Sequence, residues 1–529
     1  MCRSPSIFPR PADASHAQVM RSSADGHVGA GQSLADEQIG QRPSADEQSD
    51  EKSSYVWVVE DHRDKRVCRP WWNARFQGTL PLALSARIPL EVFRLVVDEM
   101  YPPTLTVAAL VCAAWHPRAM HNLYHTVEIR SRTSYNLLFK QCYASPRVKQ
   151  WLASTCKLVA DGERDAYSDM HEDDLEAQEK GKGEHGSVES PRRRNKSQSD
   201  NHVLPALPFA LAGLMPRVRI LYICSAGFRF IHTDFFLALS RFESVKSLTL
   251  DYCRLNNVTH LRRIVSAFPQ LTDFTMNVDF AREGAASYAG TSLFRAPSHM
   301  RLRYLDVTVE DKCMAMFLDW MTHSGLCNSL ADLSIWSGQR SMALTSLNQL
   351  LETVGASLTH FCERFGDFQN YDNALTHGNL FQNTALQSLD IKMHHIDNKA
   401  EFQVARAAWT KAADELHDIF STIRSRQLEH IKVRVQGIHD NTVLEGESAV
   451  LEKLDLRDLH EVISQPYFDA LKDVEVKMKI WPRIDQAKLD LDSIAQELEV
   501  VFCGLLRPWS DRGIVDTCIT CWNGSTYLK

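Results

Sequence analysis

The chain of 529 residues lacks the features that mark membrane-spanning, secreted and nucleic-acid-binding proteins. It has no run of about eighteen apolar residues, so we expect no membrane span and no membrane partner. Its N-terminus has no apolar stretch of the kind found in signal peptides, so we do not expect secretion by that route. Basic residues do not predominate, because the formal net charge is −7, and we expect no nucleic acid as a partner.

Paired cysteines are missing as well. The thirteen cysteines are an odd number, and most stand singly among apolar residues, as in Leu110-Val111-Cys112. This usage is typical of small buried side chains in a reducing compartment rather than of disulfides. We therefore expect the protein in the cytoplasm, the nucleus or both.

No motif of catalysis or metal binding is complete. The phosphate-binding loop G-x-x-x-x-G-K-[ST], the nucleophile motif G-x-S-x-G and the zinc motif H-E-x-x-H do not occur. Cys518 and Cys521 form a single C-x-x-C, whereas a structural zinc site requires four ligands. His394 and His395 follow a predicted strand and are expected in an exposed loop. We expect a protein that is not an enzyme and that binds no metal or other cofactor.

Three segments lie outside the regions expected to fold. Residues 1–54 are rich in small and polar residues, and residues 161–201 are strongly charged with few apolar side chains, so both are expected to be disordered. Residues 55–84 contain tryptophans among basic residues, and we expect a partly ordered extension there. The basic cluster at 191–196 is a solvated loop, a nuclear import signal or a docking site flanked by phosphorylation at Ser190 and Ser197.

The stretch 88–115 predicts two short helices. Apolar residues recur at spacings of three and four over 92–100, and a second apolar pattern covers 105–115. A Tyr-Pro-Pro sequence at 101–103 separates the patterns, because proline lacks an N–H and restricts the residue before it. Such a pair is too small to bury its own apolar surface, so it either packs on the rest of the chain or binds a partner protein.

A pattern L-x-x-Φ-x-Φ, in which Φ is an apolar residue and valine sometimes replaces the leucine, recurs beyond residue 202. Nine copies follow one another at steps of 26 to 31 residues, with two final steps of 42 and 43. Their first residues are Val218, Val245, Leu271, Leu302, Leu330, Leu358, Leu386, Leu428 and Leu471. This spacing is typical of leucine-rich-repeat solenoids, in which each repeat contributes a short strand backed by a helix. A series of unrelated α/β units with the same spacing is the alternative interpretation.

Segments between the copies have the apolar spacing of helices. We expect these helices at 231–241, 261–268, 315–324, 344–354 and 404–424. Along each strand the Φ residues should point towards the helices and the x residues away from them. Ahead of the repeats, 131–160 predicts a first unit with a helix at 137–143 and a strand at 157–160. After them, a helix at 494–501 and a strand at 513–522 would cap the open end.

The helical pair resembles the F-box, in particular the form found in fungal, basidiomycete-like F-box proteins. Ile88-Pro89-Leu90-Glu91 corresponds to the usual L-P-x-E, and residues 110–115, Leu-Val-Cys-Ala-Ala-Trp, correspond to the usual L-V-C-x-x-W. Pro117-Arg118 and Leu123-Tyr124 are also similar to that family. The alternative is an ordinary pair of core helices.

The resemblance implies that this element docks on a Skp-type adaptor and, through it, on a cullin, while the solenoid holds a target protein of unknown identity. The residues it assigns to the adaptor are Ile88, Pro89, Leu90, Val92, Phe93, Val96, Leu110, Val111, Cys112 and Trp115. On the strands, side chains that point away from the helices would contact the target. These candidates are Thr249, Asp251, Thr275, Asp306, Ser334, Trp336, Asp390, Lys392, Lys432 and Glu475.

The sequence thus predicts an α/β protein in which a short helical F-box is followed by an irregular leucine-rich-repeat solenoid. The expected boundaries are 85–130 for the F-box, 131–160 for the first helix–strand unit and 202–529 for the solenoid with its cap. The expected function is that of a substrate-recognition subunit of an SCF-type (cullin–RING) ubiquitin ligase. The alternative is a leucine-rich-repeat scaffold outside any ligase, whose helical pair only caps the solenoid.

Overall fold

The computed structural model describes most of the chain between residues 89 and 521. The described residues are 89–111, 113–162, 203–228, 231–281, 300–309, 311–337, 343–365, 377–393, 396–398, 402–439, 451–482 and 491–521. They all belong to the unit Leu80–Lys529. The predicted disordered segment 1–54, the extension 55–84 and nearly all of 161–201 lie outside the described residues, as do Ile88, Cys112, His394 and His395.

Three short helices open the described chain. They are α2 (Leu90–Asp98), α3 (Pro102–Val111) and α4 (His116–Leu123). The two prolines begin α3 instead of forming a turn before it, because in the first turn of a helix their missing N–H groups would have no partner in any case. Five residues of these helices form a small buried cluster separate from the main core, namely Val97, Leu105, Ala108, Ala109 and Ala119.

A helix–strand unit joins these helices to the sheet. It consists of β1 (Thr126–Ile129), α5 (Arg132–Ala144), α6 (Pro146–Leu152) and β2 (Lys157–Asp161). Ser131 begins α5 with a capping box, in which its side chain and that of Ser134 each accept a hydrogen bond from the other residue's backbone N–H. β1 pairs in parallel with β2, so the sheet begins at this unit.

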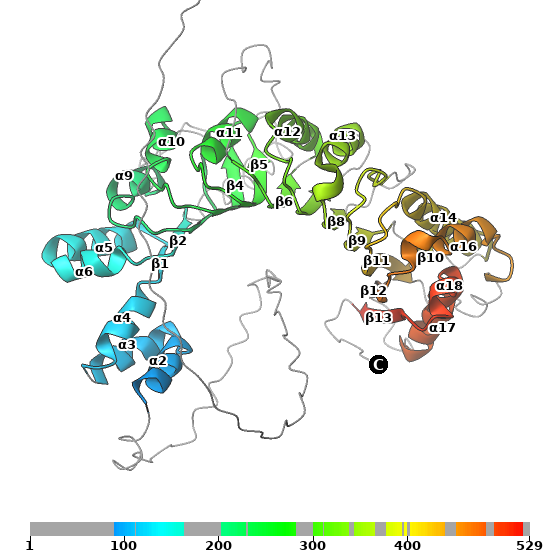
Figure 1. Ribbon diagram of the computed structural model, residues 1–529, viewed down its shortest axis with the longest axis horizontal. Coiled ribbons are helices and arrows are strands. Elements are labelled where there is room, and N and C mark those ends of the chain that lie inside the picture. The colour runs from blue at the N-terminus through cyan, green and yellow to red at the C-terminus, as the bar shows by residue number, and fades with distance from the viewer. Residues whose placement is uncertain are drawn as a thin grey trace, which may run out of the picture. The chain divides into compact units, whose positions relative to one another are not determined.

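One parallel sheet of thirteen strands organises the rest of the described chain (Figure 1). Twelve strands follow one another in chain order, and β10 (Ile396–Asn398) pairs with β11 beside this path. Beyond β2 the path continues through β3 (Ile220–Cys224), β4 (Ser247–Leu255), β5 (Asp273–Phe280), β6 (Tyr304–Val309), β7 (Asp332–Ser337), β8 (His360–Phe365), β9 (Ser388–Lys392), β11 (His430–His439), β12 (Asp473–Pro482) and β13 (Val515–Cys521).

Helices alternate with the strands and line one face of the sheet (Figure 1). They are α9 (Leu207–Leu211), α10 (Thr233–Leu239), α11 (Val258–Ser266), α12 (Asp311–Ser324), α13 (Leu344–Val354), α14 (Phe402–Ser421), α16 (Arg457–Ile463), α17 (Leu491–Leu505) and α18 (Arg507–Ser510). Short 3₁₀ turns lie at η1 (Leu204–Ala206), η3 (Gly355–Ser357) and η4 (Pro466–Phe468). The face of the sheet that points away from these helices is the open face.

The repeat pattern accounts for this arrangement residue by residue. Each of the nine strands β3–β9, β11 and β12 begins two residues after the first residue of a sequence repeat. Those nine leading leucines and valines are at most 3% exposed. Within the strands, side chains alternate between buried positions on the helix side and half-buried positions on the open face. The leading residues and the inward Φ residues together form one continuous core.

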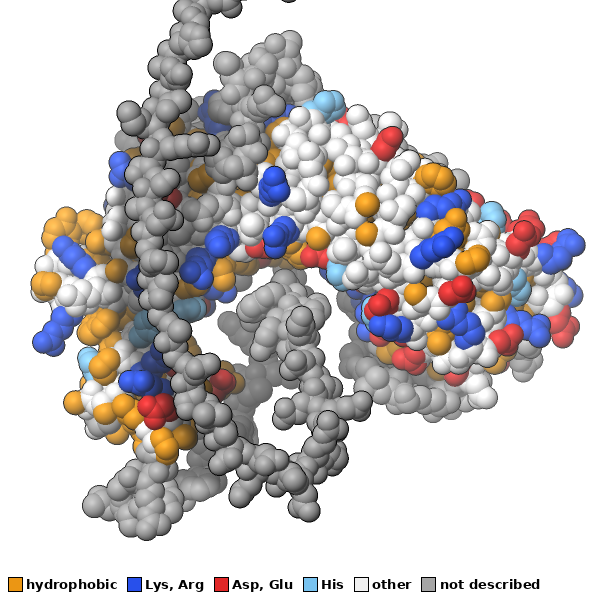
Figure 2. All heavy atoms as spheres, in the orientation of Figure 1, with side chains coloured by type: hydrophobic (Ala, Val, Ile, Leu, Met, Phe, Trp, Pro, Cys, Tyr) orange, Lys and Arg blue, Asp and Glu red, His pale blue; other side chains and the backbone are white. Residues whose placement is uncertain are grey.

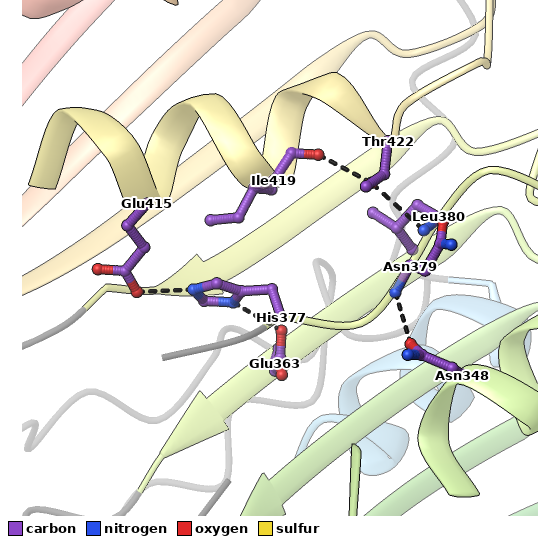
Figure 3. A network of polar contacts seen from close by, with 8 residues as sticks. All are labelled: Asn348, Glu363, His377, Asn379, Leu380, Glu415, Ile419 and Thr422. Carbon is purple, nitrogen blue, oxygen red and sulfur yellow. Dashed lines mark hydrogen bonds and ion pairs between the residues drawn. The ribbon is translucent and has the colours of Figure 1, made fainter. Parts of the chain in front are cut away.

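In the connection between β8 and β9, the described residues 377–387 are not helical. Side chains of the flanking helices hold this segment in place (Figure 3). The Asn348 side-chain oxygen accepts a hydrogen bond from the Asn379 N–H at 2.7 Å, and the Thr422 hydroxyl accepts one from the Leu380 N–H at 3.3 Å. The buried Asn383 amide donates to two carbonyls at the end of α13, at 3.0 and 2.9 Å.

The predicted fold class is confirmed: the protein is α/β, with N-terminal helices followed by a single parallel sheet that alternates with helices. The expected helices at 231–241, 261–268, 315–324, 344–354 and 404–424 correspond to α10–α14. The apolar spacing does not predict the short helices α6, α9 and α16, nor β10, because elements of three to seven residues carry too few periods. Among the described helices, none is both long enough and apolar enough to span a bilayer.

Candidate protein-interaction surfaces

The outward sides of α2 and α3 expose a set of large apolar side chains. Leu110 is 83% exposed. Its exposed apolar neighbours on these helices and the link between them are Leu90, Val92, Leu95, Val96, Tyr101, Val107 and Val111. These eight residues are named the α2–α3 surface. They lie around a buried cluster of only five residues, so the region exposes more large apolar side chains than it buries.

Helix α3 explains why the α2–α3 surface stays uncovered. Apart from two threonines, its sequence PPTLTVAALV is apolar, so it has no polar side to turn towards water. Leu105, Ala108 and Ala109 face the buried cluster. Val107 and Leu110 are exposed on the remaining circumference. Because a helix that is apolar all round is normally buried, and because clustered exposed apolar residues mark interaction sites, this surface fits a protein partner.

Polar contacts from α4 fix the frame beneath the surface. Arg118 donates from Nε and Nη2 to the two carboxylate oxygens of Asp98, each at 2.6 Å. Asn122 donates to the same carboxylate at 2.8 Å and to the Val97 carbonyl at 3.2 Å. The hydrogen bond from Arg118 is the main cause that lowers the pKa of Asp98 below its usual value. These bonds hold α2 against α4 and keep the apolar side chains of α2 turned outward.

The described adaptor residues fall into two groups. Pro89, Leu90, Val92, Val96, Leu110 and Val111 are exposed. Phe93 and Trp115 are half-buried, and their ring centroids lie 5.6 Å apart, so they support the surface from below. The resemblance does not assign Leu95, Tyr101 and Val107, although all three are exposed. For Leu95 and Val107 a signal was present in the sequence, because they stand three and four residues from Val92 and Val111 on the same helices.

A second apolar patch, which the sequence analysis missed, lies on α5. Tyr135, Phe139 and Tyr143 follow one another at spacings of four, with ring centroids 6.0 Å and 4.8 Å apart. Leu137 and Tyr143 are exposed. Figure 2 shows hydrophobic side chains gathered over α2–α6, whereas basic and acidic side chains are interspersed over α14–α18. Most of the large hydrophobic side chains that are exposed among the described residues lie between Leu90 and Tyr143.

The ten residues expected to contact a target lie on the open face of the strands, and their register places them in two adjacent rows across the sheet. The first row contains Thr249, Thr275, Asp306, Ser334, Asp390, Lys432 and Glu475. The second contains Asp251, Trp336 and Lys392. Ser334 is buried between its neighbours, whereas Trp336 is exposed. Alternation along the strands thus brings together residues spread over more than two hundred positions of sequence.

Charged side chains of the open face bond to one another across β9, β11 and β12. Arg434 donates to both oxygens of Asp390 at 2.7 and 2.5 Å. Lys432 and Lys477 approach Glu475 at 2.7 and 2.8 Å. Burial raises the pKa of Glu475, but the bonds from these two lysines outweigh it and lower that pKa overall. The Glu475 carboxylate is therefore held in its charged form.

The strands of the sheet carry cysteines with unreactive side chains. Burial raises the pKa of Cys224 and of Cys253 to about 12, and that of Cys362 to about 11. These thiols stay protonated at neutral pH, and a protonated thiol is not a nucleophile. Within the described ranges, no three histidine, cysteine or acidic side chains lie close enough to hold a metal ion.

A buried polar cluster lies on the helix side of the sheet (Figure 3). The His377 ring contacts Glu363 of β8 at 3.0 Å through Nδ1 and Glu415 of α14 at 2.6 Å through Nε2. Ionised carboxylates only accept hydrogen bonds, so the imidazole either donates from both nitrogens or one glutamate holds a proton. The three side chains are at most 4% exposed. The cluster therefore joins segment 377–387 to the sheet and to α14 and does not contact a macromolecule.

The comparison with known proteins adds no name to these surfaces. No family model matches the chain, and no curated protein matches it significantly in sequence.

Proposed function

We propose that this protein is an F-box substrate receptor. Helices α2–α4 bind a Skp-type adaptor of a cullin–RING ubiquitin ligase of the SCF type, and the open face of the sheet binds a target protein. The observation that carries the proposal is the α2–α3 surface, eight exposed apolar residues around five buried ones. The receptor has no catalytic role of its own and serves to bring the target to the ligase.

Two features support the match between this surface and an adaptor. Most of the described residues that resemble the F-box motif are the exposed ones, although motif residues that only filled a core would be buried. The surface also lacks charge, as the centres of protein interfaces do, and it is bordered by charged residues such as Arg94 and Glu99.

Binding of the full chain to a purified Skp-type adaptor tests the proposal directly. We expect the double variant Leu110→Ala with Val111→Ala to bind at least tenfold more weakly, because truncating a buried interface anchor commonly costs more than about 1.4 kcal/mol. Leu137→Ala is the matched control, since Leu137 is an exposed leucine on α5 outside the surface. Pro89→Ala with Leu90→Ala should also weaken binding.

The outcome is readable because the substituted residues are exposed and contribute little to folding. A wild-type chain that does not bind the adaptor would contradict the proposal. Equal weakening by Leu137→Ala would show that the α2–α3 surface is not the site of contact.

A non-ligase scaffold whose helical pair only caps the solenoid is the second candidate. One observation favours it: Trp151 of α6 contacts the His116 and Tyr124 rings, with centroids 5.8 and 5.6 Å apart. If the helical pair only caps the solenoid, deleting residues 85–118 should clearly lower the melting temperature of the remaining chain. The receptor predicts little change, because the buried cluster of α2–α4 is separate from the main core.

A further inference from the structure

The open face carries a row of like charges at its C-terminal end. Glu363 pairs with Ile391, so that Arg364 and Lys392 follow as neighbours on β8 and β9. Lys392 pairs with Arg434, and Arg434 pairs with Lys477. Arg364, Lys392, Arg434 and Lys477 thus lie side by side on four adjacent strands. These four residues are named the cationic row.

The adjacent row on the same strands holds fewer carboxylates than the cationic row holds cations. Neighbouring strands are only about 4.8 Å apart, and like charges on adjacent strands destabilise a sheet. The adjacent row on the same four strands holds Cys362, Asp390, Lys432 and Glu475. On these four strands the two rows together contain five cations and two carboxylates, and Asp516 of β13 pairs with Glu475 at the edge as a third carboxylate. This excess of positive charge occurs in a chain whose net charge is −7, so the overall composition does not explain it.

The same row has the opposite sign elsewhere on the sheet. Across β2–β7 it consists of Asp161, Cys224, Asp251, Asn277, Thr308 and Trp336, which include two carboxylates and no lysine or arginine. The last of these residues, Trp336, pairs with Arg364 and is 42% exposed. The cationic row is therefore a local feature of β8–β12, and an exposed indole borders it on one side.

We propose that the cationic row binds an extended acidic segment of the target protein, with an apolar residue of that segment against Trp336. This inference rests on the proposed function, because it takes the open face as the target-binding surface. The row spans about 14 Å, and every second side chain of an extended chain points the same way at intervals of about 6.7 Å. Three acidic side chains at alternate positions therefore cover the row.

A nucleic acid fits this surface less well than an acidic peptide. Grooves for single-stranded nucleic acid combine basic residues with several aromatic side chains on which successive bases stack. Here Trp336 is the exposed aromatic residue that borders the row. Asp390 and Glu475 adjoin the row and would repel a continuous phosphate backbone. An extended peptide can instead direct its carboxylates at the cations and its polar backbone elsewhere.

Fluorescence anisotropy with labelled twelve-residue peptides tests the inference on the full chain. The probe alternates glutamate with serine, and the comparison peptide alternates lysine with serine. We expect the acidic probe to bind at least tenfold more tightly than the basic one, and to lose affinity as salt rises, because exposed charges are screened. Lys392→Gln with Lys477→Gln should weaken binding of the probe at least fivefold. Lys157→Gln with Lys246→Gln, which removes two cations from the β2–β4 end, should leave it unchanged.

The outcomes separate this inference from the proposed function. Equal binding of both peptides, equal binding by the Lys392/Lys477 variant, or tighter binding of a twelve-nucleotide oligothymidine than of the acidic probe would each overturn the inference. Adaptor binding is measured on the same preparations and should be unchanged by the four lysine substitutions. Loss of wild-type adaptor binding with retained peptide specificity would overturn the proposed function while the acidic-segment site remains supported.

Discussion

Leucines and valines have opposite environments in α2–α3 and in the repeat region. The nine leading residues of the repeats are at most 3% exposed, whereas Leu110 on α3 is 83% exposed. A repeat buries its apolar residues against the next repeat, so that the stacked units share one core. Helices α2–α4 have no such neighbour and bury only a small cluster. The comparison shows that an apolar pattern specifies a surface that needs covering, while the neighbouring elements determine whether the chain itself covers it.

Polar contacts differ between the two regions in the same way. In the repeat region the His377 ring bonds to Glu363 and to Glu415, and all three side chains are almost fully buried. In α2–α4 the Asp98–Arg118 pair has similar geometry, but its side chains are 27% and 43% exposed. Solvent screens the exposed pair, whereas the bonds of the buried cluster are almost shielded from solvent.

The largest expected effect comes from breaking the buried cluster. His377→Ala leaves two buried glutamates without the ring that bonds to both, and removing one partner of a buried ionic group commonly costs about 3 to 5 kcal/mol. We expect the free energy of unfolding, measured with urea, to fall by that order. His377→Gln keeps a donor at this position and should lose less.

An exposed histidine provides the matched control for this change. His323, at the end of α12, is exposed, so His323→Ala should alter the free energy of unfolding by no more than about 0.5 kcal/mol. If both alanine variants lowered the free energy of unfolding equally, burial of the cluster would not distinguish it from an exposed contact, and the contrast between the two regions would be wrong.

The second effect compares the same substitution in the two regions. Leu350 on α13 is fully buried, and Leu110 on α3 is mostly exposed. Because both lie in helices, the change in helix propensity is the same. Leu350→Ala should lower the free energy of unfolding by about 2 to 5 kcal/mol, while Leu110→Ala should leave it nearly unchanged.

For adaptor binding, the two leucine substitutions should have the opposite order of effect from the one they have on stability. Leu110→Ala should weaken binding to the Skp-type adaptor, whereas a folded Leu350→Ala protein should retain it. A large loss of stability from Leu110→Ala would mean that the chain itself covers the α2–α3 surface. The proposal that this surface binds the adaptor would then be wrong.

Sequence reasoning was strongest where the same signal recurred. Nine copies of one pattern predicted nine strands, each of which begins at the third residue of its copy, because each copy has a leading apolar residue and alternating side chains. Short elements such as α6 and β10 offered no repetition and were not predicted. The aromatic stripe of α5 was also missed, since spacing alone does not show whether the outward side of a helix meets another element.

The buried cluster shows a second limit of the sequence. Its signal was present, because the repeat that begins at Leu358 has Glu363 where an apolar residue is expected. The position of that residue predicted burial, but its partner His377 lies 14 residues further along the chain in a non-helical segment. The other partner of that ring, Glu415 on α14, lies 52 residues beyond Glu363. Only the three-dimensional arrangement shows which groups stabilise a buried carboxylate.

The smallest effect concerns the exposed pair of α2–α4. The Arg118 hydrogen bonds lower the pKa of Asp98 below its usual value of 3.8. The pair therefore stabilises the folded state fully above that unfolded-state pKa, and the contribution is lost as pH falls through the lower folded-state pKa. Because the side chains are partly exposed, we expect Asp98→Asn to destabilise these helices by less than about 1 kcal/mol at neutral pH.

Hydrogen exchange of the amides in α2 and α4 resolves an effect of this size. At neutral pH the variant should exchange up to about fivefold faster than the wild type, because about 1 kcal/mol corresponds to that factor in the opening equilibrium. At a pH well below 3.8 both carboxylate and amide are neutral, and the two proteins should exchange at the same rate. The amides of α13 should not respond at either pH, since α2–α4 and the repeats have separate cores. A change that spread into α13 would show that the two regions open together, and the helical pair would then be a cap on the solenoid and not an independent docking element.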